Sequence, residues 1–152
     1  MEFFDTSFLE NDEIKLVLER AREAEPERKR VPAYCFGIFD RAGRRVGACD
    51  LKIGYTESLY YSGHIGYEVD EAYRGHRYAA KACRLLFELA KKHGMEYLYI
   101  TCRPDNLPSR KTCEALGGEL LEIAELPEDH DLRTEKGDTR ECIYRFALRE
   151  GA

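Results

Sequence analysis

The chain has 152 residues, with 24 Lys and Arg against 29 Asp and Glu, so its formal net charge is −5. A composition of 43% hydrophobic and 35% charged residues is typical of a folded globular protein and excludes a disordered or collagen-like chain. We expect one domain over residues 1–152, because a chain of this length can enclose a single hydrophobic core.

The sequence also bears on where the protein resides and which partners it binds. The apolar runs are far shorter than the roughly 20 residues that cross a bilayer, and residues 1–5 lack the basic start and apolar stretch of a secretory signal. We therefore expect a cytoplasmic protein with no membrane partner. The net acidity disfavours a nucleic-acid partner, and the six cysteines form no Cys-x-x-Cys pair, so we expect reduced thiols.

The first half of the chain predicts strands and one helix. Residues 3–9 form a weak strand candidate, and Asn11 or Asp12 is a candidate N-cap for a helix over the apolar positions that follow. The charged residues 22–30 are interpreted as a solvated helix end or a linker. Residues 34–40 and 45–53 predict an antiparallel hairpin, because a short connection containing Gly43 separates two β-rich runs.

A strand, a helix and a strand are then predicted in succession. Residues 64–70 alternate, with Ile65, Tyr67 and Val69 on one face. Residues 78–90 carry apolar side chains at helical spacing, and Gly94 is placed to end that helix. A β-rich run over residues 95–102 follows, so the connection is long enough for a parallel crossover.

The last third of the chain predicts a shorter helix over residues 108–116 and two strands over residues 119–125 and 140–148, with a polar loop between the strands. The whole order predicts an α+β or mixed α/β domain built on one central sheet.

The connection over residues 70–79 is the most informative stretch. The start of a helix leaves amide groups without intrahelical partners and carries partial positive charge, so such a turn can receive phosphate. Gly75 permits close approach of the backbone, and Arg74, His76 and Arg77 add donors. Residues 70–93 carry six Lys or Arg against three Asp or Glu in an otherwise acidic chain. Taken alone, the stretch is more typical of an ordinary loop with solvated arginines and one turn glycine.

This stretch resembles the acyl-CoA-binding signature of the GNAT superfamily of N-acetyltransferases. In that family a strand runs into a loop of the form Arg or Gln, x, x, Gly, x, Gly or Ala, which cradles the diphosphate of CoA. The match is at Arg74, Gly75 and Ala79, and the departure is at Arg77, where the pattern usually has Gly. A Cβ there displaces the diphosphate or imposes a different backbone angle, while the guanidinium offers a direct phosphate contact.

A second stretch supports the resemblance. Residues 100–118 are similar to the next strand and helix of the family, in which an Asn after the strand contacts the pantetheine arm; Asn106 and Gly117 fit. Asn106 is also a good N-cap in its own right. Many members have a tyrosine that protonates the departing thiolate at the position of Cys113, so that role is unfilled by the sequence.

The resemblance implies a central mixed sheet of six or seven strands flanked by about four helices, and an acetyl-CoA-dependent N-acyltransferase without a metal. A primary amine, on a small molecule or at a peptide N-terminus, attacks the acetyl thioester directly. The edge of residues 67–69 holds the pantetheine, and the Val69 amide is the candidate donor to the thioester oxygen. The implied coenzyme-binding residues are Tyr67, Val69, Arg74, Gly75, His76, Arg77, Tyr78, Ala79 and Asn106.

Glu68 or His64 is the candidate general base, since both lie on the polar face of the predicted strand. We expect the acidic residues 122–131 to attract a cationic acceptor, and a homodimer is an open expectation.

Other functions stay open. A non-catalytic sensor that binds CoA or another anion is the main alternative, and the missing tyrosine at Cys113 favours it. A non-enzymatic structural protein is third. Metal hydrolysis is disfavoured because the four histidines form no His-x-x-x-His pair. A cysteine nucleophile is disfavoured because no cysteine has an evident histidine partner in the sequence. Tyr55, Tyr60 and Tyr61 in a predicted loop are either packing residues or a wall of the acceptor pocket.

Overall fold

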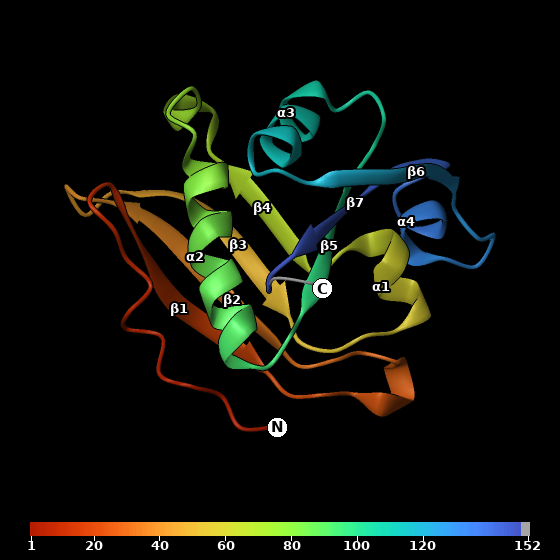
Figure 1. Cartoon of the computed structure of the whole chain (residues 1–152), viewed down its shortest axis with the longest axis horizontal. Coiled ribbons are helices and arrows are strands. Elements are labelled where there is room, and N and C mark those ends of the chain that lie inside the picture. Colours follow the sequence, from red (N-terminus) through yellow and green to blue (C-terminus); the bar gives the residue numbers. More distant parts are fainter. Residues whose placement is uncertain (150–152) are drawn as a thin grey trace. The chain divides into compact units, whose positions relative to one another are not determined.

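In a computed structural model that describes residues 1–149, the chain forms seven strands and four α-helices (Figure 1). These elements fall into two compact units. One unit contains Met1–Gly54 and Ile65–Met95, and the other contains Tyr55–His64 and residues 96–149. The α+β class, with six or seven strands and about four helices, is confirmed.

The first unit is a four-stranded antiparallel sheet covered by the longest helix. The strands lie in the order β1 (Ile14–Arg22), β2 (Ala33–Asp40), β3 (Arg45–Lys52) and β4 (Ile65–Val69). Helix α2 (Tyr78–Lys92) crosses one face of this sheet (Figure 1). The predicted hairpin, the alternating strand and the helix that Gly94 ends are all confirmed.

Helix α2 and the sheet enclose the core of this unit. Leu86 and Leu89 are fully buried on the inner side of α2, and Phe36 and Leu51 on the strands are buried to 1% exposure or less. Burial of such a side chain stabilises the fold by about 1.5 to 3 kcal/mol. The helical spacing of the apolar residues thus fixes which face of α2 meets the sheet.

The helix predicted after Asn11 or Asp12 is wrong, because this segment is strand β1. Leu16 pairs with Ile38 of β2 and is 2% exposed, whereas Val17 is 38% exposed, which is the two-residue period of a half-buried strand. The Asn11 carboxamide oxygen accepts two backbone N–H groups, but the turn it caps leads into a strand. Residues 3–9 form no strand, and residues 26–28 form a single 3-10 turn in the predicted linker.

The second unit is a three-stranded antiparallel sheet with three short helices. The strand order is β5 (Tyr97–Cys102), β7 (Arg140–Ala147) and β6 (Glu119–Glu125). Helix α3 (Leu107–Ala115) follows β5, as predicted. Helices α1 (Glu57–Ser62) and α4 (Asp131–Thr134) occupy stretches predicted as loops, because six- and four-residue helices are too short to give a periodic signal.

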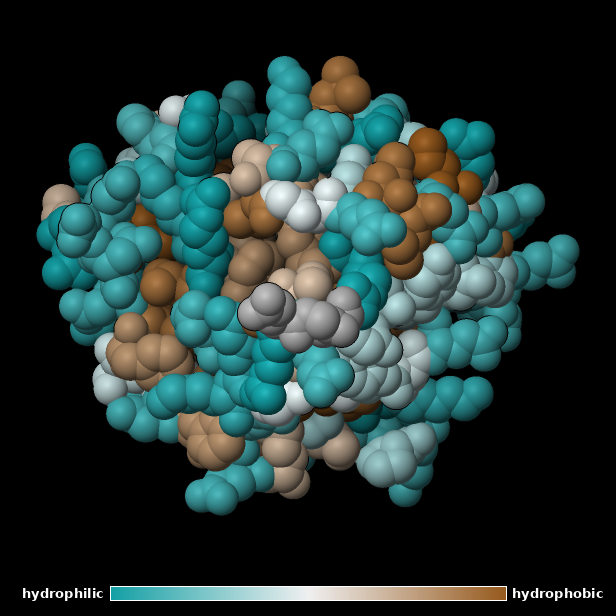
Figure 2. Space-filling model, in the orientation of Figure 1, coloured by the Kyte–Doolittle hydropathy of each residue, from teal (hydrophilic) through white to brown (hydrophobic). Residues whose placement is uncertain are grey.

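Strand β6 is an edge strand with an apolar surface. Leu120, Leu121 and Ile123 are each about 40% exposed, and Figure 2 shows hydrophobic atoms gathered where Figure 1 draws β6.

The prediction of one central sheet is wrong for the described residues, since β4 and β5 belong to different sheets and every pair of neighbouring strands is antiparallel. The helical crossover from β4 to β5 therefore joins two sheets. Among residues 1–149, no helix combines the length and apolarity needed to span a bilayer.

Candidate active site

The connection between β4 and α2 has two backbone positions in the left-handed region. After a single 3-10 turn (Glu71–Tyr73), Gly75 has φ +95°, and Arg77, the N-cap of α2, has φ +59° and ψ +31°. The Arg77 side chain makes no capping hydrogen bond to α2. The first amide groups of a helix have no intrahelical partner, so this helix start presents donors to a ligand.

Arg77 adopts the conformation that glycine adopts most readily. A non-glycine residue in the left-handed region costs about 1 to 2 kcal/mol, because its Cβ crowds the following carbonyl. The departure from the family pattern therefore leaves a glycine-like backbone angle in place, at an energetic cost to the fold. That strain resides in the loop predicted to hold phosphate.

The Arg74 guanidinium bends back toward the preceding strand. Its Nε donates to the carbonyl oxygen of Val69 at 3.1 Å, and the side chain is exposed. This bond ties the loop to the end of β4. The predicted contact of Arg74 with phosphate stays a prediction.

Strand β4 is the last strand of its sheet, and its backbone directions follow from its pairing with β3. The Asp70 N–H donates to the Val46 carbonyl at 2.8 Å, so this group points toward β3. Because amides alternate along a strand, the N–H and carbonyl of Val69 point to the outer edge. The predicted donor at Val69 thus lies on the strand edge that β3 leaves open.

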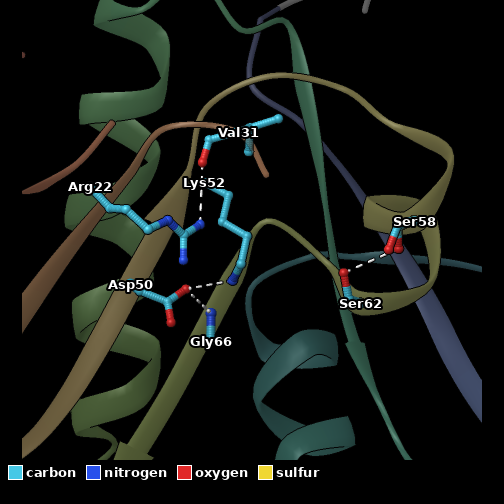
Figure 3. A network of polar contacts seen from close by, with 7 residues as sticks. All are labelled: Arg22, Val31, Asp50, Lys52, Ser58, Ser62 and Gly66. Atoms are coloured by element: carbon cyan, nitrogen blue, oxygen red, sulfur yellow. Dashed lines mark hydrogen bonds and ion pairs between the residues drawn. The ribbon is translucent and has the colours of Figure 1, made fainter. Parts of the chain in front are cut away.

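The inner edge of β4 is further fixed by a carboxylate. The Asp50 side chain on β3 accepts the Gly66 N–H at 3.2 Å and the Lys52 ammonium at 3.0 Å (Figure 3). In the same view, the Arg22 guanidinium donates to the Val31 carbonyl. Of these bonds, the one between Asp50 and the Gly66 N–H joins β3 to β4 and supports their register. In the other unit, Ser62 donates to the Ser58 carbonyl within α1.

The two candidate bases have different surroundings. Glu68 is exposed on β4, opposite Ala48 of β3. The predicted exposed polar-face position is wrong for His64, which is 0% exposed and precedes β4. Its ring Nδ1 accepts the Tyr99 backbone N–H at 3.0 Å, and the His64 backbone N–H donates to the Tyr99 carbonyl oxygen. The physical cause is packing, since the ring also contacts those of Tyr55 and Tyr99.

Asn106 and Cys113 belong to the second unit. Asn106 caps α3, its side-chain oxygen accepting the Ser109 N–H at 3.3 Å, which confirms the N-cap interpretation. Cys113, at the position of the family tyrosine, is 0% exposed. All other predicted coenzyme-binding residues lie in the first unit on β4, the loop and the start of α2.

Two of the acidic residues in the predicted acceptor-attracting stretch, Glu122 and Glu125, contact other side chains. The Tyr60 hydroxyl donates to the Glu122 carboxylate, and burial followed by this carboxylate raises the pKa of Tyr60 to about 12. Glu125 lies 3.9 Å from the Arg133 guanidinium, and Glu128 is exposed. The tyrosines pack on one another, Tyr60 against Tyr61 and Tyr99, which supports their interpretation as packing residues.

An open pocket of about 520 Å³ adjoins the β4–α2 loop in the first unit. This pocket was not predicted from the sequence. It is lined by Glu13, Asp40, Arg41, Ala42, Arg44, Gly75, His76, Arg77, Tyr78 and Lys81. The β2–β3 turn was predicted only as a hairpin connection, and the tertiary structure brings it next to the start of α2. This pocket contains four of the predicted coenzyme-binding residues.

Comparison with known proteins relates the chain to acetyltransferases. A family profile described as an acetyltransferase (GNAT) domain matches residues 1–119. No curated protein matches the chain.

Among solved structures, the microcin C7 self-immunity acetyltransferase MccE, determined with acetyl-CoA and AMP, is 20% identical with a TM-score of 0.60, over 76% of this chain and 61% of that one. A GNAT-family acetyltransferase from Bacillus anthracis is 20% identical with a TM-score of 0.61, over 76% and 67%. A ribosomal-protein-S5-alanine acetyltransferase from Vibrio fischeri is 18% identical with a TM-score of 0.61, over 79% and 64%. The chain thus shares their fold and spans less than two thirds of the first of them.

Proposed function

The chain belongs to the GNAT acetyltransferase family, and on that premise we propose that it transfers an acetyl group from acetyl-CoA to a primary amine of a small molecule or a peptide N-terminus. The observation that carries this proposal is the start of α2, where a left-handed Gly75 and Arg77 precede a helix that the Arg77 side chain does not cap. Such a turn stabilises an anion through backbone donors and the helix dipole.

The coenzyme's diphosphate is expected at this turn. The amides of Tyr78 and Ala79 lie in the first turn of α2, where donors lack intrahelical partners. Gly75 has no atom within 4 Å of the place where a Cβ would lie, so the loop surface is open there. Arg77 adds a guanidinium to the same pocket wall. We expect these groups to hold the coenzyme's charged end.

The outer edge of β4 is suited to the reacting end of the coenzyme. The pantetheine arm carries amides that can pair with a strand edge. The Val69 N–H, which points to that edge, donates to the thioester oxygen as negative charge develops on it. The amine nitrogen forms a bond to the acetyl carbon, the carbon–sulfur bond breaks, and CoA leaves as a thiolate, while the nitrogen releases its second proton to the thiolate or to solvent.

The attacking amine must first lose a proton. Of the two candidate bases we retain Glu68, because it is exposed on β4 and one residue from Val69. Its carboxylate accepts the proton directly or through one water. His64 is not retained, because it is fully buried and its Nδ1 accepts a backbone N–H. The acidic residues of the second unit, Glu128 among them, favour a cationic acceptor.

The test is release of free thiol from acetyl-CoA in the presence of a panel of neutral and cationic amines. We expect Glu68→Gln to lower kcat by about 10²- to 10⁴-fold while CoA binding in calorimetry stays unchanged. The matched control is Glu88→Gln, which removes an exposed carboxylate on α2 and should leave both unchanged. Full activity of Glu68→Gln would refute the assignment of the base.

A non-catalytic CoA sensor is the second candidate, favoured by the burial of Cys113 where many members have a tyrosine. It predicts saturable CoA binding without thiol release for any amine in the panel. Absence of CoA binding would refute both functions.

A further inference from the structure

The pocket beside the β4–α2 loop is built largely by residues outside the family motif. Its second wall is the turn between β2 and β3, which contributes Asp40, Arg41, Ala42 and Arg44. Its volume of about 520 Å³ is within the roughly 300 to 1,000 Å³ range of small-molecule sites. The two walls come from segments more than 30 residues apart in the sequence, so the pocket is a product of the fold.

The pocket is basic. Arg41, Arg44, Arg77 and Lys81 line it, against only two carboxylates, Glu13 and Asp40. The chain as a whole, by contrast, has a net charge of −5. Arginine is suited to phosphate because its guanidinium donates two parallel hydrogen bonds.

The β2–β3 turn is rigidly held. One oxygen of Asp40 accepts the N–H groups of Ala42 and Arg44 at 3.0 and 2.9 Å, and the other accepts the Arg44 Nε at 2.8 Å. These bonds, led by the Arg44 backbone N–H, hold the pKa of Asp40 below its usual range. Arg44 is thus fixed at the pocket, and its side chain remains 64% exposed to a ligand. Arg41, 3.7 Å from Glu10, is 49% exposed.

We propose that this pocket holds the 3′-phosphate of CoA, with Arg41 and Arg44 as its specificity-determining contacts. This inference rests on the proposed function, because it places the diphosphate at the start of α2. Gly75, His76, Arg77 and Tyr78 belong both to that loop and to the pocket. The nucleoside end of a coenzyme whose diphosphate lies on the loop therefore extends into the pocket, where a third phosphate meets the arginines of the β2–β3 turn.

The test compares CoA with 3′-dephospho-CoA, which retains the diphosphate and pantetheine but lacks the third phosphate. Isothermal titration of the full chain should give at least about tenfold tighter binding of CoA, as expected for charge-assisted hydrogen bonds. Arg41→Ala and Arg44→Ala should each weaken CoA severalfold and leave 3′-dephospho-CoA unchanged. The control is Arg28→Ala, an exposed arginine outside the pocket, which should change neither affinity.

Each outcome decides the proposal. Equal affinity of the wild type for the two ligands would overturn it while leaving the proposed acetyl transfer intact. Equal weakening of both ligands by Arg41→Ala would also overturn it, because the residue would then contact a group that the two share. Failure of both ligands to bind would refute the proposed function itself. Because Arg44 also supports its turn, a thermal melt of each variant identifies any loss of folded protein.

Discussion

Replacement of Glu141 by glutamine should make the chain more stable at neutral and alkaline pH. Glu141 lies on β7, the central strand of its sheet, and is 3% exposed. Within residues 1–149, its Oε1 has no hydrogen-bond partner. Burial, followed by the neighbouring Asp138 carboxyl, raises the pKa of Glu141 from 4.5 to about 8. A buried carboxylate without a full set of donors is costly, so the folded chain retains the proton.

The direction of the pH dependence follows from this raised pKa. The unfolded chain releases the Glu141 proton near pH 4.5, whereas the folded chain holds it until about pH 8. The stability that protonated Glu141 contributes is therefore fully present below pH 4.5 and is lost as pH rises through about 8. Between pH 4.5 and pH 7 this one group lowers the free energy of unfolding by on the order of 3 kcal/mol. Glutamine has nearly the same shape and no proton to lose.

Urea unfolding at pH 4.5, 7 and 9 measures this effect as the difference between Glu141→Gln and the wild type. We expect a small difference at pH 4.5, one on the order of 3 kcal/mol in favour of the variant at pH 7, and a larger one at pH 9. The control Glu128→Gln, at an exposed position, should follow the wild type. Parallel profiles of Glu141→Gln and the wild type would refute a protonated, buried Glu141.

Three further changes test the site and its support. Arg77→Gly should raise the free energy of unfolding by about 1 kcal/mol relative to Arg77→Ala, because only glycine relieves the left-handed backbone; equal unfolding midpoints in urea would contradict the strain. Burial lowers the pKa of His93, whose Nε2 lies 2.6 Å from the Tyr34 hydroxyl, so its contribution is present above about pH 6.5 and lost as pH falls. His93→Gln should flatten the melting temperature between pH 7 and 5, and an unchanged slope would reject this. Gly47→Ala should destabilise the chain by about 1 to 3 kcal/mol, because its Cβ would overlap the Glu68 carbonyl; a thermal melt identical to the wild type would show that the β3–β4 pair has room to yield.

The local sequence was sufficient to predict a helix or strand where its hydrophobic pattern is long or where a glycine marks its end. Helix α2 has a continuous apolar face and a terminal glycine, Gly94, with φ +79°. The β2–β3 hairpin has two β-rich runs with Gly43 in the turn. Each of these features acts within about 15 residues, so its physical cause is contained in the local sequence.

Strand β1 shows where local signals fail. Its apolar residues fit both a helical period and a strand period, and only pairing with β2 decides between them. The same holds for His64, whose polarity predicted exposure but whose ring is buried against Tyr55 and Tyr99. Burial of a polar residue depends on a hydrogen-bond partner supplied from elsewhere in the chain, here the Tyr99 N–H.

The sequence by itself indicated the family and the loop through a resemblance at Arg74, Gly75 and Ala79, because that motif lies within a few consecutive residues. It determined the α+β class through alternating periods of strand and helix. Only the tertiary structure decided that Arg77 takes a left-handed angle and that Arg41 and Arg44 line a pocket with it. The reason is that a backbone angle unfavourable in isolation, or a contact between distant arginines, is set by the packing of the whole unit.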